Sequence, residues 1–140
     1  MHGLARDRLE LARNPQVTIG AHTVNHPLLA KTSEGAVRTE LKMSRAVIAA
    51  ALGKAPDHLA YPYGDPTTAG TREFRIAAEL GFKTAVTTRP GVLFGEHADH
   101  LAALPRVSLN GGYQDTRYIP VLMSGAATAL WNGFRRVDAA

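Results

Sequence analysis

The chain has 140 residues, of which 45% are hydrophobic and 20% are charged, so it is long enough for one domain with a hydrophobic core. It contains no cysteine, which excludes disulfide bonds and thiolate metal sites and leaves histidine, aspartate and glutamate as metal ligands. The net charge is +4, but the lysines and arginines are spread along the chain, which favours a solvated surface over a nucleic-acid interface.

The N-terminal residues alternate charged and apolar side chains and lack the hydrophobic stretch of a signal peptide. The longest mostly apolar run, residues 118–131, is too short to cross a bilayer. From these two features we expect no membrane span and, by default, a cytoplasmic location.

The first elements predicted along the chain are a helix, a strand and a loop that carries two histidines. Residues 4–13 favour a short helix, which the following Asn-Pro pair ends. The β-branched run at residues 17–19 predicts a buried strand. The loop after it contains His22 and His26, four residues apart, and closes at a proline.

Neutral imidazole is a good ligand for zinc, and a spacing of four residues lets both rings reach one ion if the loop turns helically. A single pair of this kind is a weak motif in a chain with six histidines, so two surface histidines are the alternative interpretation.

Helices and strands continue to alternate after the histidine loop, which predicts a parallel sheet or barrel segment with functional residues at the carboxyl ends of its strands. The irregular residues 92–103 contain His97 and His100, which we expect to be solvated. The last helix carries an apolar stripe that includes Trp131, which we expect to be buried. The predicted elements are a helix capped by Ser33 or Thr32 and ended by Gly53, a strand over residues 58–61, a helix capped by Thr71 and ended by Gly81, strands over residues 84–88 and 104–110, and a helix over residues 116–131.

Two loops of this sequence match the motifs of one family. Residues 22–27, His-Thr-Val-Asn-His-Pro, resemble the His-Ser/Thr-x-x-His-Pro motif of the polysaccharide deacetylases, the NodB-homology or carbohydrate esterase family 4 group. Residues 61–64, Tyr-Pro-Tyr-Gly, resemble a form of the third motif of that family. The resemblance is strongest over residues 17–109 and implies a single domain over residues 1–140.

The resemblance implies an α/β fold, a partial (β/α) barrel that corresponds to the C-terminal half of a distorted seven-stranded barrel. It also implies metal-dependent hydrolysis of N-acetyl groups on a carbohydrate polymer or oligosaccharide. By this resemblance His22 and His26 bind a divalent metal, most simply zinc, which lowers the pKa of a bound water. The backbone N–H of Tyr63 would stabilise the oxyanion, and Tyr61 and Pro62 would contact the substrate.

The sequence also departs from the family pattern. The first motif of the family supplies a metal-binding aspartate and a catalytic base from an Asp-Asp pair, and no Asp-Asp pair occurs in this chain. The arginine of the third motif is missing too, and Arg106 is the candidate to replace its charge. The aspartates that remain as substitutes are Asp57, Asp65, Asp99 and Asp115, of which only Asp65 lies in a motif loop, where it also suits a turn.

Because part of the barrel is missing from this sequence, we expect open strand edges that need a second copy or an N-terminal partner segment. Three functions stay open on the sequence. The first is a deacetylase that is complete only when the first motif is supplied, and the second is a non-catalytic carbohydrate- or metal-binding remnant. The third is an unrelated basic α/β module that binds phosphate or nucleic acid.

Overall fold

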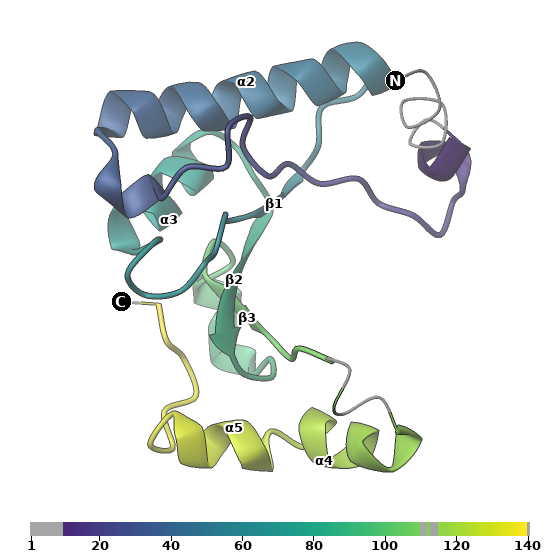
Figure 1. Cartoon of the computed structure of the whole chain (residues 1–140), viewed down its shortest axis with the longest axis vertical. Coiled ribbons are helices and arrows are strands. Elements are labelled where there is room, and N and C mark those ends of the chain that lie inside the picture. The colour runs from purple at the N-terminus through teal and green to yellow at the C-terminus, as the bar shows by residue number, and fades with distance from the viewer. Residues whose placement is uncertain (1–9, 110–111, 113–114, 140) are drawn as a thin grey trace.

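A computed structural model describes residues 10–109, 112 and 115–139. Figure 1 shows a central sheet between a long helix at the top and two short helices at the bottom. The elements are, in chain order, the 3₁₀ turn Leu29–Lys31, α2 Glu34–Leu52, β1 His58–Ala60, α3 Thr71–Glu79, β2 Thr84–Pro90, the 3₁₀ turn Gly95–Asp99, β3 Leu104–Arg106, the 3₁₀ turn Thr116–Tyr118, α4 Ile119–Met123 and α5 Ala126–Trp131.

The three strands form one parallel sheet in the order β1-β2-β3. Leu59 of β1 pairs with Ala85 of β2, and Val86 of β2 pairs with Leu104 of β3. The α/β class and the parallel sheet predicted from the alternation of elements are therefore confirmed.

The ends of α2 form where the sequence places its cap residues. The Ser33 hydroxyl accepts a hydrogen bond from the Ala36 N–H at 3.3 Å, and Gly53 ends the helix in the left-handed region with φ 74°. The helix buries Val37 and Leu41 against the core.

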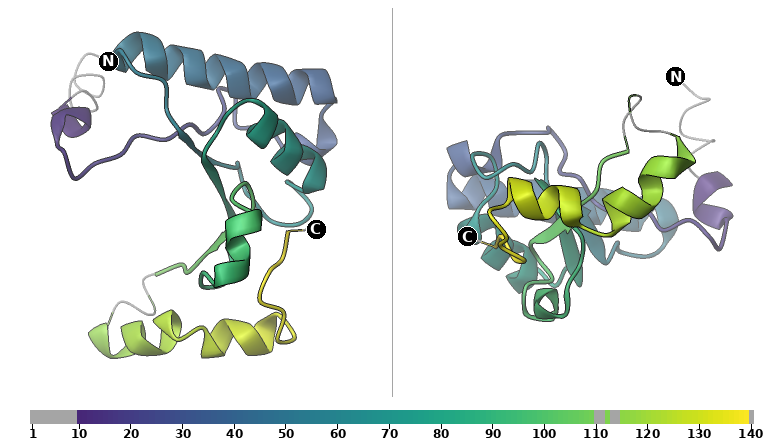
Figure 2. Two further views of the ribbon diagram at one scale, coloured as in Figure 1. Left: turned by 180° about the vertical axis from the view of Figure 1, so that it is seen from behind. Right: turned by 90° about the horizontal axis from the view of Figure 1, so that it is seen from below.

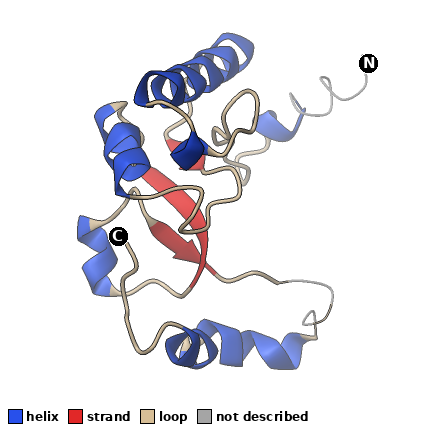
Figure 3. Cartoon of the chain, turned by 60° about the vertical axis from the view of Figure 1, so that its left-hand side comes forward, coloured by secondary structure: helices blue, strands red, loops and turns tan. Residues whose placement is uncertain are grey.

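The start of α3 differs by one residue from the prediction that Thr71 caps it. Gly70 is the N-cap instead, because the Glu73 carboxylate reaches back and accepts the Gly70 N–H at 2.9 Å. The helix turns Phe74 and Ile76 inward and packs against α2 and the central strand β2, as Figure 3 shows.

The core is a single cluster of buried apolar side chains from the sheet, α2, α3 and the segments that flank them. Its central position leaves the carboxyl ends of the strands free to carry loops. The cluster contains Ala21, Leu29, Val37, Leu41, Leu59, Tyr61, Ala69, Phe74, Ile76, Ala77, Phe82, Ala85 and Ala103.

The predicted strand before the histidine loop is wrong in extent. Only Ala21 pairs with the sheet, as an isolated parallel bridge to Leu59, with its N–H bonded to the His58 carbonyl at 2.8 Å. Val17 and Ile19 are only half-buried because no further strand of the described chain covers them. Of the predicted helix at residues 4–13, residues 10–13 are helical and the remainder lies outside the described residues.

The predicted long C-terminal helix is also wrong. Gly125, at φ 73°, separates two short helices, and a Cβ on it would lie 2.7 Å from Val92. The expected buried stripe faces solvent, with Trp131 81% and Leu130 73% exposed. Figure 2 shows α4 and α5 lying apart from α2, on the far side of the sheet.

Three further expectations on the second half of the chain need correction. His97 is buried, and its Nδ1 accepts the Phe94 N–H at 3.0 Å inside the 3₁₀ turn, whereas His100 is exposed as expected. β2 continues to Pro90, beyond the predicted end at residue 88, and β3 ends at Arg106, short of the predicted residue 110.

Candidate functional site

His22, His26 and Tyr63 form a cluster at the carboxyl end of β1. The His22 and His26 rings meet edge to face with centroids 4.9 Å apart, and the His26 and Tyr63 rings do so at 4.7 Å. His22 follows the bridge residue Ala21, and Tyr63 follows β1. The two loops meet at the carboxyl edge of the sheet, where the alternation of elements predicts the functional residues.

The orientation of His22 is fixed by the sheet backbone. Its Nδ1 lies 2.7 Å from the Ala60 carbonyl oxygen. A carbonyl can only accept, so Nδ1 carries the proton of the neutral ring and Nε2 presents its lone pair. This is the arrangement of metal-binding histidines, whose second nitrogen donates to an oxygen of the protein.

Glu40 of α2 binds the loop that carries the two histidines. Its carboxylate accepts the backbone N–H groups of Val24 and Asn25, each at 2.9 Å, and the Asn25 side-chain amide at 2.6 Å. Although burial opposes the change, these hydrogen bonds lower the pKa of Glu40. The ionised carboxylate therefore fixes the segment between the two imidazoles.

Three non-glycine residues around the cluster have left-handed backbone. Thr23, His26 and Tyr63 have φ values of 62°, 53° and 60°. Each such residue costs about 1 kcal/mol or more, and residues of this kind concentrate at functional sites. The Thr23 hydroxyl accepts the His26 N–H at 3.1 Å, which contributes to holding this conformation.

The Tyr63 loop exposes one backbone donor at the site. Tyr63 is 51% exposed, and its N–H has no hydrogen-bond partner among the residues that the structure describes. The next residue, Gly64, bonds to β2 because its carbonyl accepts the Thr88 N–H at 3.0 Å. The loop is thus tied to the sheet on one side and open on the other.

Tyr61 and Pro62, the predicted substrate contacts, lie in the core. Tyr61 is 2% exposed, its hydroxyl donates to the Ala102 carbonyl at 2.9 Å, and its ring packs on Phe74. Burial, with the nearby charge of Glu73, raises the pKa of Tyr61, so the phenol is neutral. Both side chains are buried, so neither is exposed to contact a substrate in this structure.

Arg106 lies away from the histidine cluster. It is exposed at the end of β3, and β2 separates β3 from β1. Two strand spacings are about 10 Å, so its side chain would have to extend along the edge of the sheet toward the histidines.

The carboxylates considered as substitutes for the missing Asp-Asp pair have other contacts. The Asp65 carboxylate accepts hydrogen bonds from the Thr67 N–H at 2.8 Å, from the Thr67 hydroxyl at 2.6 Å and from the Thr68 hydroxyl. These bonds, chiefly the one from the Thr67 hydroxyl, lower the pKa of Asp65. Asp57 pairs with Lys83 at 2.7 Å. Asp115 caps a 3₁₀ turn, and Asp99 is exposed in another.

The fit of this site to a divalent metal is therefore partial. His22 and His26 suit two of the positions, but the described residues bring together no group of three or more histidine, aspartate or glutamate side chains. A catalytic zinc site uses three protein ligands. One ligand would have to come from outside the described cluster.

Glu40 is the site residue that sequence reasoning missed. Its place on the polar face of a regular amphipathic helix made it look like an ordinary surface charge. Only the fold shows that this face of α2 lies under the histidine loop.

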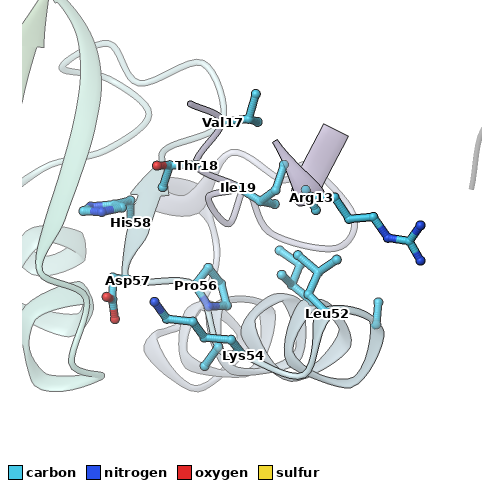
Figure 4. A pocket seen from close by; sticks show the side chains of 13 residues that line it. Arg13, Val17, Thr18, Ile19, Leu52, Lys54, Pro56, Asp57 and His58 are labelled. Carbon is cyan, nitrogen blue, oxygen red and sulfur yellow. The ribbon is translucent and has the colours of Figure 1, made fainter. Parts of the chain in front are cut away.

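A cavity of about 720 Å³ lies at the opposite end of β1. Figure 4 shows Asp57 and His58, at the amino end of that strand, with Val17, Ile19 and Leu52 around it. In α/β folds this end of the strands serves stability and the carboxyl end carries the chemistry. The cavity is therefore not part of the histidine site.

A parallel α/β sheet with two imidazoles at its carboxyl edge fits the family that the two motif loops resemble. The model of the polysaccharide deacetylase family matches residues 6–85, and the chain belongs to that family. No curated protein matches the sequence. Within the described residues no helix is long and apolar enough to cross a membrane.

Several solved structures are similar to this chain. The deacetylase PplD of Streptococcus pyogenes, in complex with acetate, is 33% identical with a TM-score of 0.57, over 64% of this chain and 38% of that one. The putative polysaccharide deacetylase BA0330 of Bacillus anthracis is 22% identical, with a TM-score of 0.68 over 86% of this chain and 35% of that one. A mutant of BA3943, a pseudoenzyme of carbohydrate esterase family 4, is 16% identical, with a TM-score of 0.51 over 95% of this chain and 54% of that one.

These comparisons confirm the family suggested by the two motif loops. The second and third structures share the fold alone, because their identity to this chain is low. The chain spans 38% and 35% of the length of the first two structures, so it matches only part of each.

Proposed function

We propose that this chain is part of a metal-dependent deacetylase domain that removes N-acetyl groups from a carbohydrate polymer or oligosaccharide. The observation that carries the proposal is the orientation of His22, whose Nδ1 is bonded to the Ala60 carbonyl so that its Nε2 is left as a ligand, with the His26 ring centroid 4.9 Å from that of His22. The reaction class comes from the family to which the chain belongs. We infer that residues 1–140 form one domain, which is part of a (β/α) barrel.

The residues of this chain would bind and orient. His22 and His26 would hold the metal, with zinc as the ion that best suits two imidazoles and a carboxylate. When bound, the metal polarises an acetyl carbonyl and makes a water more acidic. The Tyr63 N–H would donate to the oxygen that becomes negative, and Arg106 would add positive charge from β3.

Because a third metal ligand and a general base are missing, hydrolysis would depend on carboxylates supplied by another segment. The described residues offer no third ligand, and the sequence has no Asp-Asp pair. An N-terminal partner segment would supply both carboxylates and cover the open edge beside Ala21, whereas a second copy of the chain, which also lacks an Asp-Asp pair, would only cover the edge.

A second candidate is a non-catalytic remnant that binds metal or carbohydrate without hydrolysis. The absence of a three-ligand group among the described residues favours it, and a pseudoenzyme of the same fold shows that such proteins occur. A deacetylase assay with zinc and an N-acetylglucosamine oligomer separates the two. The first candidate predicts turnover only when an Asp-Asp segment is added, whereas the remnant stays inactive with that segment.

The metal site itself is tested by calorimetry with zinc. The wild-type chain should bind one zinc ion weakly, and His22→Ala with His26→Ala should remove that binding. His100→Ala is the matched control, because His100 is exposed and lies away from the cluster. Equal zinc affinity of the double variant and the wild type would exclude this site.

A further inference from the structure

A second cavity, of about 560 Å³, lies at the carboxyl edge of the sheet, on the same side as Tyr63. Its walls come from the Asp65 loop, the end of β2 at Arg89, and the C-terminal segment that begins with Trp131. Asp65 is two residues from Tyr63, so their backbones are at most about 7 Å apart. The cavity therefore adjoins the histidine site.

The C-terminal wall is attached to the body of the protein. The Arg89 guanidinium, 2% exposed, donates from Nη1 to the backbone carbonyl of Asp138 at 2.8 Å and to its carboxylate at 3.0 Å. The Asn132 amide donates to the Pro90 carbonyl at 2.8 Å. These bonds hold Trp131 beside the end of β2.

The charges of the lining side chains balance. Two carboxylates, Asp65 and Asp138, and two guanidinium groups, Arg89 and Arg135, line the cavity, so neither an anionic nor a cationic ligand gains a net attraction. Carboxylates accept hydrogen bonds from hydroxyl groups, and guanidinium and amide groups donate hydrogen bonds to hydroxyl oxygens. A neutral ligand with many hydroxyl groups suits this set.

Trp131 adds an apolar surface to the polar lining. Trp131 is 81% exposed although tryptophan is normally well buried, and it is one of the residues that line the cavity. An exposed indole beside polar side chains can pack on the C–H face of a pyranose ring while the ring hydroxyls bond to the sides.

We propose that this cavity binds one sugar unit of the substrate, next to the unit at the histidines, with Trp131 as the stacking residue. This inference rests on the proposed function for the identity of the ligand as a carbohydrate. It adds a site contributed by the C-terminal segment, which lies beyond residues 6–85 of the family match.

The test uses the fluorescence of Trp131, which is the only tryptophan in the chain. Titration with a tetramer of N-acetylglucosamine should change its emission in a saturable way. By calorimetry, Trp131→Ala should weaken binding at least about tenfold, and Arg135→Ala about threefold. Circular dichroism should show an unchanged fold, because the indole is exposed.

Leu130→Ala is the matched control, since Leu130 is 73% exposed on the same helix and does not line the cavity. Its affinity and emission change should equal those of the wild type. An unchanged affinity in Trp131→Ala, no binding of the tetramer to the wild type, or stronger binding of inorganic phosphate would overturn the proposal.

The double variant of His22 and His26 separates this proposal from the proposed function. It should lose zinc, and the tetramer should still change the Trp131 emission in a saturable way, with an affinity lowered only by the loss of contacts to the unit at the histidines. If the wild type binds the tetramer but no zinc, the metal site fails and the sugar site stands.

Discussion

Asn25 donates both its backbone N–H and its side-chain amide to the carboxylate of Glu40, at 2.9 and 2.6 Å. This contact joins a loop to a helix fifteen residues further along the chain. It fixes the position of Asn25, which lies between the two histidines in sequence, relative to α2.

The Glu40 contact predicts that Glu40→Ala will disturb metal binding without unfolding the protein. Zinc affinity should fall about tenfold, as for other residues that orient metal ligands, and the free energy of unfolding should fall by about 1 kcal/mol. Calorimetry and urea unfolding measure the two effects. Lys42→Ala, at an exposed position of the same helix, should change neither.

Glu40 also predicts an acid dependence of stability. Its pKa in the folded protein lies below the usual 4.5, so it stabilises the fold above that value and loses the contribution as the pH falls through the lowered pKa. The difference in unfolding free energy between wild type and Glu40→Gln should therefore be constant from about pH 7 to 5 and shrink below about pH 4. A difference that grows on acidification would contradict this assignment.

Gly64 predicts a larger cost of substitution than Gly53. Both glycines have φ 74°, but a Cβ on Gly64 would lie 2.8 Å from the Thr88 nitrogen, whereas one on Gly53 meets nothing within 4 Å. Gly53→Ala should cost about 1 kcal/mol for its backbone alone, and Gly64→Ala about 3 kcal/mol. Similar unfolding midpoints in urea for the two variants would show that the loop moves aside at no cost.

Arg89 is a charged residue in the interior, and its substitution should lower the free energy of unfolding strongly. Besides Asp138, it donates to the Ala69 carbonyl at 3.0 Å and lies over the Phe74 ring. Arg89→Met should therefore lower the free energy of unfolding by about 3 kcal/mol, because buried acceptors lose their donor. Arg106→Met, exposed at the end of the neighbouring strand, should change it by less than about 0.5 kcal/mol and serves as the control.

Local patterns in the sequence predict much of the fold. The caps of α2, the three strands and their parallel order follow from residue types whose preferences act over a few neighbours. The His22 to His26 loop and the Tyr63 loop were also recognisable, because their motifs are contiguous.

The same patterns fail where distant contacts decide. The apolar stripe of the C-terminal segment has helical spacing, yet Gly125, which packs closely against Val92, divides the segment into two short helices. The apolar residues of the stripe remain exposed. His97 was expected in solvent and is buried, and here the contact is local, because its Nδ1 accepts the Phe94 N–H within the 3₁₀ turn.

The sequence by itself determined the family, the order of the elements from α2 to β3 and the two histidines, since these depend on residues close together in the chain. Only the tertiary structure decided that Glu40 holds the histidine loop, that Tyr61 is packed inside, and that Trp131 stands beside a cavity at the same edge. The physical reason is that hydrogen bonds and burial join residues far apart in the chain, and their partners are set by the packing of α2, the sheet and the C-terminal segment.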